Sequence, residues 1–310
     1  FKTLFKQGGS LVTGYDFSQA KQNGISLFSA AAQQLILNNQ VPGSFTDGVL
    51  TDTQSVQLLN HSLYALARMP LSNSLEGTAG LRRQLQNFDT TDINKSSGSQ
   101  SSQGQYSANA YELGLNFKLG PASRYFLRLN HSFRFANTDE YWGFDLSNNR
   151  VFSGELKPQY TRAYEVGYEY VSGAHQAGVV VGQSVTQDEI RYNPNFYRNS
   201  NLSDDVFRTS LAANYAYSHG AGGRLMLGAR LQRAEFLNGA FAGQALGLVP
   251  HATFNATWLQ ANDVRTKLGL SVLHVTKQNY DVAPESATGK DQMPAYTTAD
   301  LFWTRNYGKL

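Results

Sequence analysis

Apolar and polar residues alternate along most of the chain with a period of two, which is typical of β-strands with two different environments. In YELGLNFKL (111–119) the Tyr, Leu and Phe residues share one face, and Glu, Gly, Asn and Lys share the other. VFRTSLAANYAY (206–217) repeats this pattern and ends its apolar face in two tyrosines. The alternation predicts about twelve strands, near residues 10–18, 58–69, 74–87, 111–119, 124–135, 160–171, 175–189, 206–217, 223–236, 250–260, 264–276 and 295–306.

The connections between these strands alternate between short and long. Short turns are expected at PLSN, GPAS, SGAH, HGAGG and ANDV, and long loops at about 20–56, 88–106, 137–159, 190–205, 237–249 and 277–294. A soluble sandwich with its core on the apolar face has no reason to place every long loop at one end. An up-and-down, antiparallel transmembrane β-barrel does, with short periplasmic turns and long extracellular loops. We therefore expect the apolar face to meet lipid, with Tyr215 and Tyr217 in an aromatic girdle at the short-turn end.

The composition of the chain excludes several kinds of partner, site and membrane segment. The net charge is +3 and the basic residues are scattered, so no nucleic-acid partner is predicted. Cysteine is absent, which excludes disulfides and cysteine-based metal or catalytic sites. No apolar run approaches the roughly 20 residues that a membrane helix needs. The first residues, FKTLFKQGGS, do not read as a signal peptide.

No catalytic constellation stands out, and we expect neither an enzyme nor a bound cofactor. The histidines are far apart and show no metal-binding spacing, so no metal site is predicted. A hydrolase pair at His131 and Ser132 is disfavoured because neighbouring strand residues point to opposite faces. DTTDINKSSGSQSSQG (89–104) lacks the closing glutamate of a calcium loop and is expected to be a flexible external loop.

Ligand binding is expected in the long loops. Aromatic rings beside a cation suit a flat anionic or aromatic ligand through stacking and cation–π contacts. The alternative is that these side chains pack the loops together or belong to the outer aromatic girdle. The candidates are Tyr141, Trp142, Tyr192, Phe196, Tyr197 and Arg198.

Four stretches carry a resemblance to a known family. FRFANTDEYWGF (133–144), LKPQYTRAYEVGYEY (156–170), QDEIRYNP (187–194), and LVPHATFNATWL (248–259) followed by MPAYTTADLFWTR (293–305) resemble barrel segments of TonB-dependent outer-membrane receptors, in the family's order and spacing. The second stretch is the most specific. Together they cover roughly residues 10–306.

This resemblance implies a 22-stranded barrel of the Gram-negative outer membrane, of which the chain would supply about twelve strands. No part resembles the family's N-terminal plug domain or its last strands, so residues 1–310 look like a piece of barrel truncated at both ends. The implied function is uptake of a scarce ligand, most simply an iron–siderophore or similar chelate. The implied partners are the TonB–ExbB–ExbD complex, acting through the plug, and outer-membrane lipid and lipopolysaccharide. A passive porin-like or surface-binding barrel is the alternative.

Overall fold

The structure is a computed structural model of the chain. It describes residues 2–5, 8–28, 49–94, 98–144, 150–152, 156–193, 197–220, 222–261, 266–280, 292–305 and 307. Within these residues no helix is long and apolar enough to cross a membrane.

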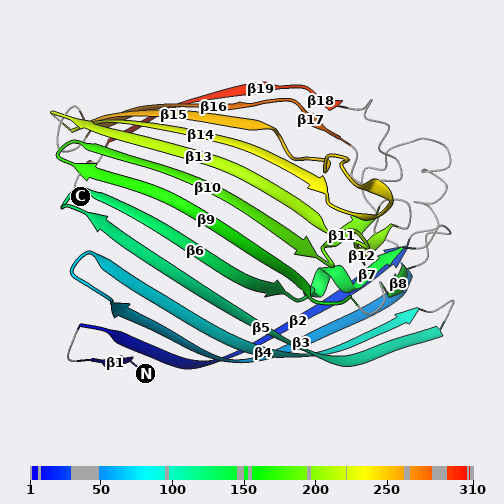
Figure 1. The fold of residues 1–310 in the computed structure, drawn as a ribbon. Coiled ribbons are helices and arrows are strands. Elements are labelled where there is room, and N and C mark those ends of the chain that lie inside the picture. The colour runs from blue at the N-terminus through cyan, green and yellow to red at the C-terminus, as the bar shows by residue number, and fades with distance from the viewer. Residues whose placement is uncertain are drawn as a thin grey trace.

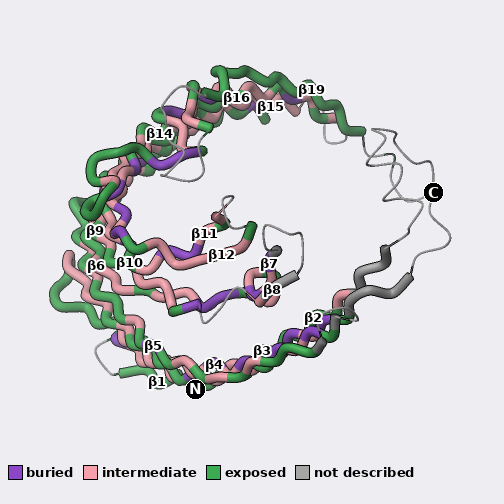
Figure 2. Tube along the Cα trace, turned by 90° about the vertical axis from the view of Figure 1, so that its right-hand side faces the viewer, coloured by how far each residue is buried: buried purple, intermediate pink, exposed green. Residues whose placement is uncertain are grey.

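One antiparallel sheet dominates the described structure, and it curls into an open arc (Figures 1 and 2). Its neighbouring strands follow one another along the chain, as an up-and-down barrel requires, and β1 and β19 lie at its two edges. In spatial order its thirteen described strands are β1 (Lys2–Leu4), β2 (Ser10–Phe28), β3 (Val49–Pro70), β4 (Leu75–Asn94), β5 (Gly98–Leu119), β6 (Ser123–Arg134), β9 (Gln159–Ser172), β10 (His175–Gln187), β13 (Val206–His219), β14 (Gly223–Phe236), β15 (Ala252–Ala261), β16 (Thr266–Val275) and β19 (Tyr296–Arg305).

The predicted strands and their up-and-down order are confirmed, and β1 is a short addition. The smaller strands form three separate hairpins. They are β7 (Trp142–Phe144) with β8 (Arg150–Phe152), β11 (Ile190–Asn193) with β12 (Arg198–Asn201), and β17 (Gln278–Asn279) with β18 (Gln292–Met293). Two 3-10 helices, η1 (Thr138–Tyr141) and η2 (Gly239–Phe241), lie in the long connections.

One predicted loop proved to be largely strand, and strands occupy both ends of a second. β4 runs to Asn94 and β5 resumes at Gly98, so the expected loop at 88–106 is wrong. β2 and β3 extend into the expected loop at 20–56 over residues 20–28 and 49–56, and residues 29–48 lie outside the described part of the chain. Thr90 and Asp92 are buried rather than solvated. The prediction failed because these strand ends are mostly polar on both faces, so the alternation on which it rested is missing there. Their backbone hydrogen bonds to the neighbouring strand form without it.

The outer face of the sheet carries the expected apolar band. Cross-strand pairing aligns one row of aliphatic side chains across five successive strands, and all five are more than a third exposed. The row consists of Leu127, Val166, Val181, Leu211 and Leu231. Contiguous exposed apolar surface of this extent indicates a nonaqueous neighbour, which for a barrel is lipid.

Aromatic and imidazole rings gather on the outer face at the short-turn end. The ring of His175 stacks on Tyr217 with centroids 4.9 Å apart, and its Nδ1 lies 2.8 Å from the Tyr215 hydroxyl. Tyr125 and Tyr168 pair across β6 and β9, also at 4.9 Å. Tyr215 and Tyr217 therefore lie where an interfacial girdle is expected, with polar tips available to headgroups.

The inner face is polar and carries ion pairs between neighbouring strands. Arg128 donates to Glu165 at 3.1 Å, and Arg124, four residues nearer the short turn on β6, pairs with Glu169. Gly167 sits between these pairs, under the ring of Phe126, where an added Cβ would come within 2.2 Å of that ring. The glycine therefore leaves room for an aromatic ring to lie flat on the wall between two charged pairs.

The two faces of β13 provide a direct test of this assignment. Leu211→Lys places a charge in the apolar band and should destabilise the barrel by about 2–4 kcal/mol, the usual cost near the bilayer midplane. Ser210→Lys, one residue earlier on the polar face, should cost less than 1 kcal/mol because lumen positions tolerate charge. Urea unfolding of the protein in lipid vesicles measures both. Equal costs at the two positions would contradict the assignment of faces.

Candidate ligand-binding site inside the barrel

The long connections after β6 and β10 turn inward rather than outward. End-on, the β7–β8 and β11–β12 hairpins lie inside the arc of the main sheet (Figure 2). The two hairpins contact each other. An added Cβ on Gly143 of β7 would come within 2.3 Å of Arg198 Cβ on β12, and Asn199 donates to the Glu140 carbonyl at 3.2 Å. The two predicted ligand loops therefore form one unit.

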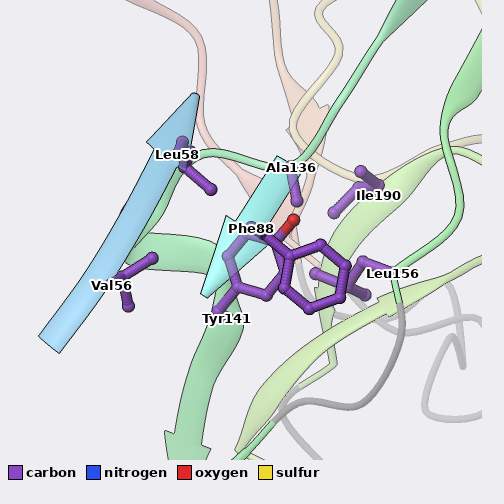
Figure 3. Packing of buried hydrophobic residues seen from close by; sticks show 7 residues of the cluster. All are labelled: Val56, Leu58, Phe88, Ala136, Tyr141, Leu156 and Ile190. Carbon is purple, nitrogen blue, oxygen red and sulfur yellow. The ribbon is translucent and has the colours of Figure 1, made fainter. Parts of the chain in front are cut away.

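An apolar cluster fastens this unit to the inner wall (Figure 3). Its buried members come from the inner faces of β3 and β4, from the link between β6 and η1, from η1 itself, from the segment before β9 and from the first residue of β11. They are Val56, Leu58, Phe88, Ala136, Tyr141, Leu156 and Ile190. Tyr141 is at the centre, fully buried, with its ring stacked 5.2 Å from Phe88 and 6.0 Å from Phe152. Burial raises the pKa of its hydroxyl, which therefore stays neutral and lies 3.5 Å from Gln86 Oε1.

A carboxylate clamp holds η1 in place. Arg134, at the end of β6, donates to both carboxylate oxygens of Glu140 at 2.9 and 2.7 Å. The same carboxylate accepts from the backbone N–H of Asn137 at 2.8 Å. Arg134 also reaches the Ile190 carbonyl at 3.3 Å, which ties the β11 hairpin to β6. Both bonds come from Arg134 Nη1, and charge-assisted hydrogen bonds of this kind are stronger than neutral ones.

A second clamp holds the base of the β11–β12 hairpin. Arg208 on the inner face of β13 donates to both oxygens of Glu189 at 2.8 and 2.7 Å, and to Thr186 Oγ1 at 3.2 Å. Asn201 accepts from the Lys157 amide at 2.8 Å and donates to the carbonyls of Lys157 and Asp188 at 2.9 and 2.7 Å. The start of β9 and the hairpin are thereby locked together.

The six predicted site residues do not share one environment. Tyr141 is buried and packs against other aromatic side chains of the protein. Trp142 is partly buried, and its ring packs edge-on against Phe152 with centroids 5.6 Å apart. Tyr192 and Tyr197 are each 48% exposed on the inward-folded hairpin, and Arg198 is partly buried. Phe196 lies outside the described residues.

Two hollows adjoin this unit on the inner wall. One, of about 490 Å³, lies beside η1 and is lined by amide side chains; Gln84 and Gln86 both donate to Asn60 Oδ1 at 3.1 Å. The other, of about 140 Å³, is lined by Trp142 and Gln54, and the Trp142 indole N–H has no hydrogen-bond partner among the described residues. Amide side chains therefore line both hollows, and the Trp142 ring lines the smaller one with its indole N–H buried.

The sequence reasoning missed the charged residues that position the loops. Arg134, Glu140 and Glu189 lie within the motifs of the family resemblance, but Arg208 lies outside all of them. Arg191 is also part of this region; burial lowers the pKa of its guanidinium, and Glu189 partly offsets that effect. Within the described residues, no group of three His, Asp or Glu side chains is arranged to hold a metal ion.

Comparison with known proteins identifies the class. The family described as TonB dependent receptor-like, beta-barrel matches residues 2–309, and the chain belongs to that family of outer-membrane receptors. No individually curated protein matches it.

Similar solved structures share the fold. The ferric yersiniabactin uptake receptor FyuA from Yersinia pestis superposes with a TM-score of 0.71 at 14% identity, covering 97% of this chain and 44% of that one. The siderophore receptor PiuA from Acinetobacter baumannii gives 0.72 at 13% identity, covering 99% and 48%. The copper transporter OprC gives 0.69 at 14% identity, covering 97% and 47%. The chain thus spans less than half the length of each of these proteins.

Tyr141 tests whether the apolar cluster holds the hairpins against the wall. Tyr141→Ala should destabilise this region by about 3–5 kcal/mol, the usual cost of deleting a buried aromatic ring. It should release the β7–β8 hairpin to protease. Tyr141→Phe should change little, because it loses only a long hydrogen bond to Gln86. Limited proteolysis with mass mapping of the cleavage sites distinguishes them, and equal protection in the Ala variant would show that the cluster is not the fastening.

Proposed function

We propose that this chain is the barrel portion of a receptor that imports a ferric siderophore or a similar metal chelate across the outer membrane. The observation that carries the proposal is the meeting of the two aromatic- and cation-bearing loops inside the lumen of a barrel of this family. Three of the similar structures are described as a ferric yersiniabactin uptake receptor, a siderophore receptor and a copper transporter. All three descriptions concern metals or their chelates.

The chemistry of the exposed loop residues fits such a ligand. Tyr192 and Tyr197 present half-exposed rings, and Arg198 adds a cation on the same hairpin. Ring faces stack on flat aromatic chelators, and a guanidinium offsets the negative charge that many metal chelates carry. In this proposal no bond is made or broken in the cargo, so the barrel is not an enzyme.

Transport against a gradient needs an energy source, and the barrel wall offers none. We therefore propose coupling to the inner-membrane TonB–ExbB–ExbD complex through a plug domain, as the family membership supports. A passive porin-like barrel is the competing function, and it differs in one respect that can be measured. Its flux would not depend on TonB or on the proton-motive force.

The test uses the complete open reading frame that contains this chain, expressed in a Gram-negative host that lacks its own siderophore receptors. Uptake of radioactive iron is measured for a panel of purified ferric siderophores, in hosts with and without TonB. Uptake of at least one chelate that disappears without TonB supports the proposal. Uptake that persists without TonB favours the passive barrel, and no uptake of any chelate would count against a siderophore cargo.

The loop aromatics give a sharper expectation. Replacing Tyr192 and Tyr197 together by Ala should weaken binding of the transported chelate by about three- to thirtyfold, the range for losing one or two ring contacts. Tyr111→Leu serves as the matched control, because Tyr111 is similarly exposed but lies on the outer face. Binding is measured by fluorescence quenching on the purified receptor. An unchanged affinity in the double variant would remove the hairpin from the binding site.

A further inference from the structure

A hollow of about 330 Å³ lies on the inner wall of the barrel, across β9, β10, β13 and β14. Small side chains form its floor and leave the space open; they belong to Gly182, Ser184, Ser210 and Ala234. Arg208, which clamps the base of the β11–β12 hairpin through Glu189, also lines the hollow. The hollow therefore adjoins the proposed cargo loops and extends from them toward the short-turn end.

The connection between β14 and β15 walls one side of this hollow. Leu248 and Val249 supply the lining there. Val249 packs against a buried apolar cluster made of Val206, Ala234, Phe236 and Leu246. Leu248 has a φ of +61°, which is rare outside glycine, and its N–H donates to the Asn279 carbonyl at 2.8 Å. A backbone of this kind persists only where its surroundings hold it, so the wall of the hollow is fixed.

The charged residues around the hollow leave one cation without a counter-charge. The paired ones are Glu165 with Arg128, Arg208 with Glu189, and Arg233 with Glu235. Arg230 also lines the hollow, is exposed to the lumen, and makes no hydrogen bond or ion pair with any residue that the structure describes.

The strand register explains why Arg230 has no counter-charge. Ala212 and Thr253 face it across the two neighbouring strands, and neither carries a charge. Gly228 and Gln232 flank it on the same face of β14, and they are uncharged as well. A single guanidinium therefore stands at the edge of a small polar hollow, where an anion would complete it.

We infer that this hollow binds one carboxylate group of the cargo, with Arg230 as its counter-ion and Ser210 and Gln232 as neutral donors. A guanidinium and a carboxylate match in planar, often bidentate geometry. The single charge of a carboxylate balances the single free cation, whereas a phosphate group carries nearly two charges. The volume is at the lower limit of small-molecule sites, roughly 300–1,000 Å³, and suits one arm of a chelate. The inference rests on the proposed function and narrows its cargo to metal chelates with a free carboxylate arm.

The first test is calorimetric titration of the complete purified receptor with citrate, a metal-free tricarboxylate. Trimethyl citrate, its uncharged ester, and inorganic phosphate are compared at the same ionic strength. We expect citrate to bind and the ester to show no binding. Phosphate binding as strong as that of citrate would mean an unselective anion site. No binding of citrate would mean that another part of the receptor fills the hollow. Either result would overturn the inference.

Three variants locate the site. Arg230→Ala should weaken citrate binding about tenfold, as expected for the loss of one charge-assisted bond. Arg230→Lys keeps the charge and should weaken binding by no more than about threefold. Arg224→Ala is the matched control, because Arg224 lies on the same face of β14, six residues nearer the short turn and outside the hollow. It should change nothing. Equal losses in the Lys and Ala variants of Arg230, or an equal loss in Arg224→Ala, would refute the assignment.

Uptake separates the failure of this inference from the failure of the proposed function. A ferric chelate with free carboxylates should enter about tenfold faster than a neutral ferric trihydroxamate, and Arg230→Ala should slow only the first. Equal uptake of both chelates, unaffected by Arg230→Ala, would overturn the carboxylate site and leave metal-chelate import standing. Uptake of no chelate at all would overturn both.

Discussion

Every backbone amide that faces lipid must find its partner within the protein, because the bilayer core offers none. Between its two edges, β1 and β19, the described sheet meets this requirement by an antiparallel ladder in which each main strand pairs with the main strands before and after it. The ladder fixes the register, and the register fixes which side chains face lipid. Leu211 faces outward and Ser210 faces inward because β13 pairs with β10 and β14 in one particular register. Both the inner site and the outward apolar row depend on that register.

The inner site shows how a rigid wall can hold irregular loops in a defined place. Two arginines at the ends of barrel strands, Arg134 and Arg208, each hold a loop glutamate by two hydrogen bonds. Tyr141 adds an apolar anchor between them. Such partly buried charge pairs cost desolvation, which good geometry offsets, and they specify one arrangement of the loops. The exposed rings of Tyr192 and Tyr197 are thereby presented from a fixed base.

Much of the fold could be predicted from alternation alone, since period-two patterning survives wherever one strand face meets lipid and the other water. The same signal failed at 89–104, because beyond the bilayer both faces of β4 and β5 are polar. The candidate site was predicted only as loops rich in rings and charge. That Tyr141 would be buried while Tyr197 stays exposed depends on which way the connections after β6 and β10 turn. The clamp by Arg208 could not be foreseen, because its partner Glu189 lies 19 residues away on a connection of irregular backbone.

The two faces of β13 tie the inner site to the outward apolar row. Arg208 fastens the loop hairpin inside, and Leu211, three residues later, faces outward in the row of aliphatic side chains. A slip of one residue in the pairing would turn Arg208 toward lipid and Leu211 toward the lumen. The loop clamp and the apolar row would be lost together, at the cost of a charge in hydrocarbon. The apolar band that holds the barrel in its membrane therefore also enforces the register at which the loop hairpins are fastened to the inner wall.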